Sequence, residues 1–164
     1  MANAREEPTL VGGSTASVPT AFAAFYRERY AAMARLAFLL TGGDPAAEEL
    51  AQDAFLGTFR AWDRVEEPNA YVRAALVNAC RSHRRRRERE MRRQLAAPPP
   101  VTQAADELRD VIGSLPFRQR AVVVLRFYED LPEAEIATAL GCTVVAVKSL
   151  LHRATRALRE VIER

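Results

Sequence analysis

Two stretches of this sequence have side chains suited to binding nucleic acid. Residues 71–93 hold nine Arg and only two acidic residues, and residues 143–164 hold five basic and two acidic residues. A guanidinium group donates paired hydrogen bonds to a phosphate or to the edge of a guanine. Two separated basic stretches are therefore typical of a protein that contacts DNA or RNA at two places.

The overall charge is less informative than its location. The net charge of the 164 residues is +3, and Lys148 is the only Lys among 24 basic residues. This preference for Arg has two explanations, nucleic-acid contacts and the codon bias of a GC-rich genome. The uneven distribution along the chain favours a nucleic-acid partner whichever explanation holds.

Residue types that support catalysis or metal binding are scarce. The chain has two His and two Cys, with no CxxC pair and no glycine-rich phosphate loop. We therefore expect no enzyme activity, no metal and no cofactor, and we interpret Cys80 and Cys142 as small apolar residues. No apolar run has the length of a membrane span and no signal pattern opens the sequence, which predicts a cytoplasmic location without membrane insertion.

The second basic stretch is predicted to lie on a helix-turn-helix. Pro132 suits the first turn of a helix, and Gly141 supplies the left-handed residue that ends it. Thr143 is the predicted N-cap of the following helix. That helix has an apolar side formed by Val144, Val147, Leu151, Ala154 and Leu158. Two helices joined by so short a turn form the unit that lays its second helix in a DNA major groove, although an ordinary helical hairpin has the same pattern.

Helical periodicity also organises the rest of the chain. A first helix is expected over 21–40, ended by Gly42 and Gly43. A second should start after Asp44 and Pro45 and run to Trp62, which we assign to the core. A third should begin near Asn69 and continue into the arginines, with no apolar positions beyond Cys80. Two more helices are expected before the helix-turn-helix, over 106–112 and 116–128.

These elements predict an all-α fold. We expect two small helical domains joined by a Pro-rich linker, the second ending in the helix-turn-helix. The expected boundaries are a disordered tail over 1–20, a first domain over 21–93, a linker over 94–105 and a second domain over 106–164.

Three segments carry motifs that occur together in one protein family. They are Asp44–Trp62, Asn69–Ser82 and Leu115–Ala154. In that order they resemble the core-polymerase-binding helix, the −10-reading helix and the −35-binding helix-turn-helix of bacterial sigma factors. The class resembled is the extracytoplasmic-function (ECF) class of the sigma-70 family.

The resemblance implies a sigma factor that binds core RNA polymerase, recognises the −10 and −35 promoter elements and promotes DNA opening. It implies three partners, namely core polymerase, promoter DNA and an anti-sigma factor. The residues implied in polymerase binding are Glu49, Gln52, Asp53 and Leu56. Those implied at the −10 element are Asn69, Tyr71, Arg73, Asn78, Arg81, Arg84 and Arg85. Those implied at the −35 element are Thr143, Val145, Ala146, Lys148, Ser149, Leu150 and Arg153.

The residue types leave some roles open. Tyr71 can stack on a base, but an aromatic residue at a helix start equally suits the core. Leu150 stands where the family commonly carries Arg, and Val145 and Ala146 are apolar. These three residues favour thymine-methyl contacts or recognition of DNA shape over hydrogen bonds to bases.

Two other functions share parts of this pattern. A helix-turn-helix regulator that does not associate with core polymerase would have the same C-terminal motif, and it is the alternative function. An adaptor that binds RNA through the Arg-rich stretch would leave that motif without a purpose.

Overall fold

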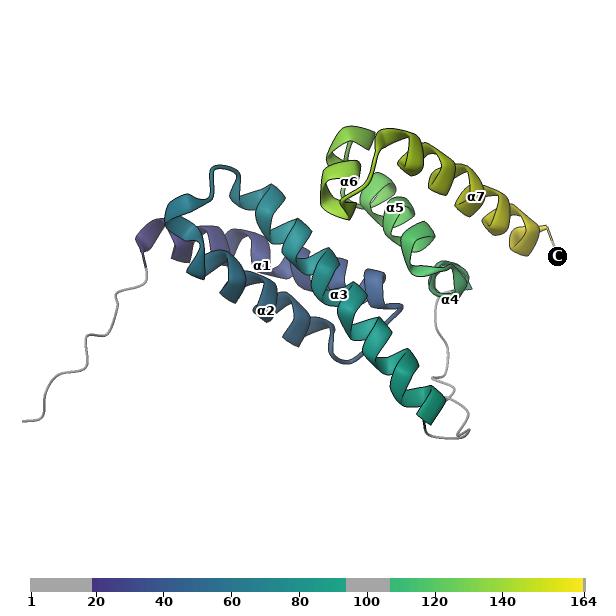
Figure 1. Cartoon of the computed structure of the whole chain (residues 1–164), viewed down its shortest axis with the longest axis horizontal. Coiled ribbons are helices and arrows are strands. Elements are labelled where there is room, and N and C mark those ends of the chain that lie inside the picture. The colour runs from purple at the N-terminus through teal and green to yellow at the C-terminus, as the bar shows by residue number, and fades with distance from the viewer. Residues whose placement is uncertain (1–18, 94–106, 164) are drawn as a thin grey trace, which may run out of the picture.

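The chain is entirely helical over the residues that the structure describes. The structure is a computed structural model and describes residues 19–93 and 107–163 (Figure 1). Its helices are α1 (Thr20–Thr41), α2 (Ala47–Arg60), α3 (Pro68–Arg93), α4 (Glu107–Ser114), α5 (Phe117–Phe127), α6 (Glu133–Leu140) and α7 (Val144–Ile162), with a short 3₁₀ turn, η1, at Trp62–Arg64. The all-α prediction is confirmed. The expected Pro-rich linker, and all but the last two residues of the expected tail, lie outside the described residues.

Helices α1, α2 and α3 form the N-terminal group, in which α2 packs against both of its neighbours. Apolar residues at helical spacing on α1 and α3, such as Met33, Leu36, Val72 and Leu76, are completely buried. Seven aromatic rings cluster in the group, with neighbouring centroids 4.9–6.5 Å apart. They belong to Phe22, Phe25, Tyr26, Tyr30, Phe55, Phe59 and Trp62. The prediction that Trp62 packs in the core is confirmed.

Helix ends follow the predicted turn chemistry at two glycines. Gly42 ends α1 with φ +75°, and the next amide, Gly43 N–H, donates to Phe38 O (2.8 Å). Gly141 ends α6 with φ +61°. The left-handed conformation costs glycine little, so both turns reverse the chain sharply. The start of α3 differs from its prediction, because Pro68 is itself the first helical residue.

Helices α4 to α7 form the C-terminal group, built around α5. Ala121, Val122 and Leu125 of α5 are completely buried, as is Ile136 of α6. Helix α7 lies across α5 and follows α6 through the Gly141 turn. The predicted helix-turn-helix is therefore present.

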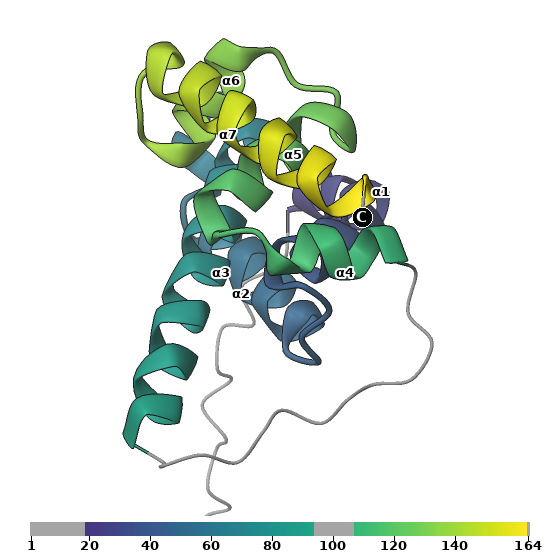
Figure 2. The ribbon, with the colours of Figure 1, turned by 90° about the vertical axis from the view of Figure 1, so that its right-hand side faces the viewer.

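The two groups pack directly against each other. Helix α6 contacts α3, and α5 and α4 contact α1 (Figure 2). One continuous cluster of buried apolar residues includes side chains from both groups, among them Leu40, Leu76, Val122 and Ile136. The described parts of the two expected domains thus share a core.

Among the helices that the structure describes, none alone is long and apolar enough to cross a bilayer. Only α6 and α7 taken as a pair meet the length and composition requirement, and that pair is bent by 98°.

Candidate nucleic-acid interface

Helix α7 packs one side against the core and presents the other to solvent. Thr143 Oγ1 accepts a hydrogen bond from Ala146 N–H (3.1 Å), so the predicted N-cap is confirmed. Val147 and Ala154 are completely buried, whereas Val144 is 37% exposed. The apolar side of α7 therefore starts at Val147, not at Val144 as predicted.

The residues predicted at the −35 element differ in exposure. Five are exposed, and these are Thr143, Val145, Lys148, Ser149 and Arg153. Ala146 and Leu150 are half-buried, and Leu150 packs against the core. Leu150 is therefore less accessible to a DNA groove than its place in the sequence indicated. Val145, at 73% exposure, is the apolar residue of this set that is best placed to meet a thymine methyl group.

The residues predicted at the −10 element lie on two different sides of α3. Tyr71, Asn78 and Arg85 are seven residues apart and all exposed, so they form one row along the helix. Tyr71 is 42% exposed, and its alternative assignment to the core is wrong. Arg73 and Arg81 instead face the C-terminal group.

Arg73 is buried between the two groups by an ion-pair network. Its side chain lies 3.5 Å from a Glu129 carboxylate oxygen and 3.7 Å from one of Glu135. Arg29 of α1 also reaches Glu129, at 3.7 Å. Farther along α3, Arg81 donates a hydrogen bond to Leu140 O (3.2 Å). In this arrangement Arg73 is paired with carboxylates and is not open to a phosphate.

Asn69 borders a cavity at the same boundary. The cavity has a volume of about 300 Å³ and is lined by residues of α3 and α6, including Arg73, Glu135 and Thr138. The first turn of α3 therefore lies at the edge of the contact between the groups.

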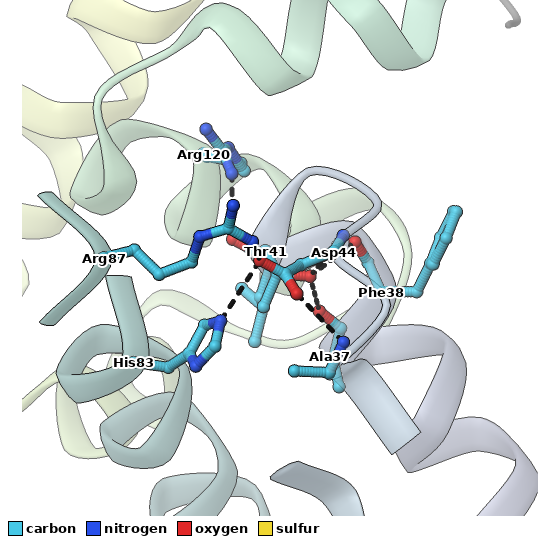
Figure 3. A network of polar contacts seen from close by, with 9 residues as sticks. Ala37, Phe38, Thr41, Asp44, His83, Arg87 and Arg120 are labelled. Carbon is cyan, nitrogen blue, oxygen red and sulfur yellow. Dashed lines mark hydrogen bonds and ion pairs between the residues drawn. The ribbon is translucent and has the colours of Figure 1, made fainter. Parts of the chain in front are cut away.

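The Arg-rich end of α3 is partly committed to structural contacts. Arg87 donates to Asp44 Oδ2 (2.6 Å), and His83 Nε2 lies 3.1 Å from the same oxygen (Figure 3). Arg84 pairs with Glu88 one turn away, at 2.8 Å. Arg85 and Arg86 are exposed. Only part of the Arg run is thus available to hold phosphates.

Asp44, in the loop after α1, is the anion that binds this end of α3. Burial alone would raise the pKa of the Asp44 carboxyl, but hydrogen bonds from Ala46 N–H, His83 and Arg87 outweigh burial and hold it below its ordinary value. Asp44 therefore remains ionised and ties α3 to the loop after α1.

The residues predicted to bind polymerase form one exposed patch on α2. Glu49, Gln52, Asp53 and Leu56 are all exposed. Leu56, at 44% exposure, borders an apolar hollow of about 240 Å³ whose other walls include Phe22, Tyr26 and Phe59. Charged and amide groups around an apolar centre are the usual composition of a protein interface.

Arg120 is an important residue that the sequence did not single out. It is 4% exposed and joins the groups by donating to Leu40 O of α1 (3.0 Å), while it also donates to Gly113 O and to Leu115 O (3.1 Å). Burial, followed by the nearby charge of Arg84, lowers the pKa of Arg120 to about 10. Its partners are backbone carbonyls from distant segments, and no periodic pattern in the sequence indicates such contacts.

The cysteines have the environments of structural residues. Cys80 is completely buried, and burial is the main cause that raises the pKa of its thiol to about 12. Cys142 is half-buried, and both thiols are free. Within residues 19–93 and 107–163 no group of three or more His, Cys, Asp or Glu side chains could hold a metal ion.

Comparisons with known proteins agree with the arrangement of the two groups. Residues 25–90 match the family model for sigma-70 region 2, and residues 105–158 match that for sigma-70 region 4. Two solved structures share the fold. The sigma factor RpoE of Bartonella quintana, in complex with the anti-sigma factor NepR, has a TM-score of 0.73 at 22% identity over 87% of this chain and 97% of that one. CnrH, in complex with the cytosolic domain of CnrY, has a TM-score of 0.64 at 24% identity over 87% and 88%.

Relatives identified by sequence cover most of the chain. The RNA polymerase sigma-E factor of Streptomyces coelicolor is 34% identical over 85% of this chain and 84% of its own length. The ECF RNA polymerase sigma factor SigL of Mycobacterium tuberculosis is 31% identical over 93% of this chain and 95% of its own. The chain therefore belongs to the sigma-70 family, as an ECF sigma factor with regions 2 and 4 for promoter recognition, and so to the non-enzymatic transcription initiation factors.

Proposed function

We propose that the N-terminal group binds core RNA polymerase and the −10 element, and that the C-terminal group binds the −35 element. The observation that carries this proposal is the exposed row of Tyr71, Asn78 and Arg85 on α3. A ring stacks on a base, an amide bonds a base edge and a guanidinium neutralises a phosphate. Together they suit a single strand of DNA better than a closed duplex.

The same row supports a role in opening the promoter. Extruding a base from a duplex costs a few kcal/mol in lost stacking and pairing, and a site that holds the extruded base lowers that cost. The loop over 63–69 and the start of α3 would receive the base, with Asn69 and Tyr71 as its contacts. Arg84 and Arg85 would then hold the adjacent phosphates.

At the −35 element, α7 would enter the major groove with its exposed side. Val145 would meet a thymine methyl group, and Ser149 and Arg153 would bond bases or phosphates. Thr143 and Lys148, at the start of the helix, would fix its position on the DNA backbone.

On the polymerase side, Leu56 would insert from α2 while Glu49, Gln52 and Asp53 surround it. The apolar hollow beside Leu56 would receive an apolar side chain from the polymerase. Burial of Leu56 would supply much of the affinity, since fully burying a leucine is worth about 1.5–3 kcal/mol.

These different binding roles imply two domains, over 21–93 and 106–164, joined by a linker over 94–105. An anti-sigma factor is a further proposed partner, because a solved sigma factor of similar fold is in complex with the anti-sigma factor NepR. A protein that works with RNA polymerase would act in the cytoplasm.

The proposal is tested with polymerase reconstituted from this chain and core enzyme. Promoter fragments that the holoenzyme selects from a genomic library would supply the DNA. Asn78→Ala should lower promoter opening, followed by permanganate reactivity, about tenfold while leaving core affinity within twofold. Leu56→Ala should instead weaken core binding about tenfold.

Glu28→Gln, an exposed change on α1 outside all the predicted sets, is the matched control and should alter neither property. Equal loss of opening and core binding in both test variants would contradict the assignment. So would tight binding of a duplex site by the chain alone together with no complex with core polymerase, which is the behaviour of a conventional regulator.

A further inference from the structure

An arginine-lined cleft lies where the two groups meet, and neither of the proposed promoter contacts uses it as a whole. It has a volume of about 480 Å³, within the range typical of sites for small ligands. Its walls come from α3, the start of α5 and the middle of α7. Five of its lining residues are arginines, and these are Arg81, Arg84, Arg85, Arg118 and Arg153.

The positive charge of this arginine cleft is poorly balanced. Glu88 is the only acidic residue in its lining, and it is paired with Arg84. The pKa of Arg81 is lowered by burial and then by the charges of Arg118 and Arg85, so guanidinium groups from both sides of the cleft are close enough to repel each other. A cleft that gathers like charges from two separate groups costs free energy unless an anion occupies it.

Two donor groups on arginines that line the cleft are also left without partners. The Nε of Arg81 and one terminal nitrogen of Arg84 are buried and make no hydrogen bond to any described residue. A buried donor without an acceptor costs about 1–3 kcal/mol in typical proteins. Both side chains therefore gain when they turn so that these donors meet the oxygen atoms of an anion in the cleft.

The size and lining of the cleft restrict which anion fits. Pro116, Phe117 and Leu150 line it together with the arginines, so its wall combines apolar and cationic side chains. Its small volume fits a compact anion with several charges and excludes a duplex. A chain of phosphates carries the required charge and offers acceptors in the geometry that arginine forks bind best.

We propose that the arginine cleft binds a polyphosphate chain, either free or carried by a nucleotide, and that this anion holds the two groups together. The cleft exists only where the groups are packed, so its ligand stabilises the packed arrangement relative to any arrangement in which they separate. Bound polyphosphate therefore lowers the population of any state of the protein in which the two groups are separated.

The binding step is tested by isothermal titration calorimetry on the full chain without polymerase or DNA, so its outcome is independent of the function proposed above. Sodium tripolyphosphate should bind saturably, with one site. Arg118→Ala should weaken binding about tenfold, since Arg118 belongs to the cleft but to none of the predicted DNA-binding sets. Arg156→Ala, an equal loss of charge on the exposed side of α7, is the control and should leave the affinity within twofold.

A second measurement follows the packing of the groups. At about ten times the Kd of tripolyphosphate, amide exchange that depends on separation of the groups should slow about tenfold in α6 and in the first half of α3. In the Arg118→Ala variant, whose Kd should be about tenfold higher, the slowing at the same concentration should be only about twofold. ATP distinguishes the source, because equal affinities indicate a free phosphate chain and tighter ATP binding indicates a nucleotide.

Three results would overturn the proposal. One is the absence of saturable tripolyphosphate binding to the wild-type chain. Another is an equal loss of affinity in Arg118→Ala and Arg156→Ala, which would indicate general attraction to a basic surface. The third is an unchanged exchange rate at the α3–α6 contact when the cleft is saturated.

Discussion

At the scale of single residues, the Asp44 carboxylate binds two basic side chains of the Arg-rich end of α3, His83 and Arg87. It also accepts a hydrogen bond from Ala46 N–H (2.9 Å). A basic residue on α3 that faces Asp44 is therefore structural, and one that faces solvent is available to nucleic acid. The sequence could not separate these two sets, because four consecutive arginines point in every direction around a helix.

Asp44 should also make the stability of the protein depend on pH. Its folded pKa lies below its unfolded value of about 4, so its stabilising effect is complete above about pH 5 and is lost as the pH falls through the folded pKa. Asp44→Asn should lower the free energy of unfolding at pH 7 by about 1–2 kcal/mol. The variant should also lose less stability than wild type between about pH 5 and pH 2. Urea unfolding followed by circular dichroism across this range measures both effects.

The matched control for this prediction is Asp53→Asn, which neutralises an exposed carboxylate on α2. It should change stability by no more than about 0.5 kcal/mol, as is usual for exposed surface positions. If the stability of Asp44→Asn falls with pH as steeply as that of wild type, the carboxylate is not the group that fastens α3.

At the scale of helices, most of the fold follows from local rules that the sequence displays. Gly42 and Gly141 end their helices because both adopt positive φ, and apolar residues at helical spacing mark the buried sides of α1 and α3. Errors occur at the ends of elements, as at Val144, where an apolar residue in a first turn is left 37% exposed. Periodicity identifies the side of a helix but not how far along it the core extends.

The candidate site was only partly predictable for the same reason. The resemblance implied Tyr71, Arg73, Asn78 and Arg85 alike, and the structure shows that Tyr71, Asn78 and Arg85 form one exposed row. The burial of Arg73 depends on Glu129 and Glu135 from a distant part of the chain. Ion pairs between segments more than fifty residues apart leave no mark in local spacing. The burial and ion pairing of Arg73 therefore could not be predicted without the packing of the two groups.

The N-cap of α7 gives a prediction at the element scale. Thr143→Ala removes the acceptor for Ala146 N–H and should lower the free energy of unfolding by about 1 kcal/mol. The first turn of α7 should then exchange its amide protons faster, which hydrogen-exchange mass spectrometry measures. Thr143→Ser keeps the acceptor and should behave like wild type, whereas equal effects of Ala and Ser would indicate that the threonine methyl group matters and the cap does not.

At the scale of the whole molecule, the contact between the groups competes with DNA for the same side chain. Arg73 lies among the predicted −10 residues but is occupied by Glu129 and Glu135, which present carboxylates where DNA would present phosphates. Breaking a buried ion pair by removing one partner typically costs 3–5 kcal/mol, which applies to Arg73 and Glu129, whose side chains are both 9% exposed. The Glu135 side chain is 56% exposed, so its pair with Arg73 contributes less to keeping the groups together. Arg73 itself can join Tyr71, Asn78 and Arg85 in contacting a DNA strand only when these glutamates release it.

Neutralising both glutamates should therefore separate the groups and expose Arg73, the predicted −10 residue that their contact buries. In the double variant Glu129→Gln with Glu135→Gln, Arg73 loses its carboxylate partners, and the affinity for a fluorescent single-stranded oligonucleotide should rise severalfold. Fluorescence anisotropy at fixed salt measures the affinity, and small-angle scattering should record a larger radius of gyration. The control double variant, Glu133→Gln with Glu160→Gln, removes two equal charges that pair with Lys148 and Arg156 inside the C-terminal group. An equal gain in affinity in the control would mean that net charge alone attracts the DNA. A gain confined to the interface variant would mean that separation of the two groups increases binding of the oligonucleotide.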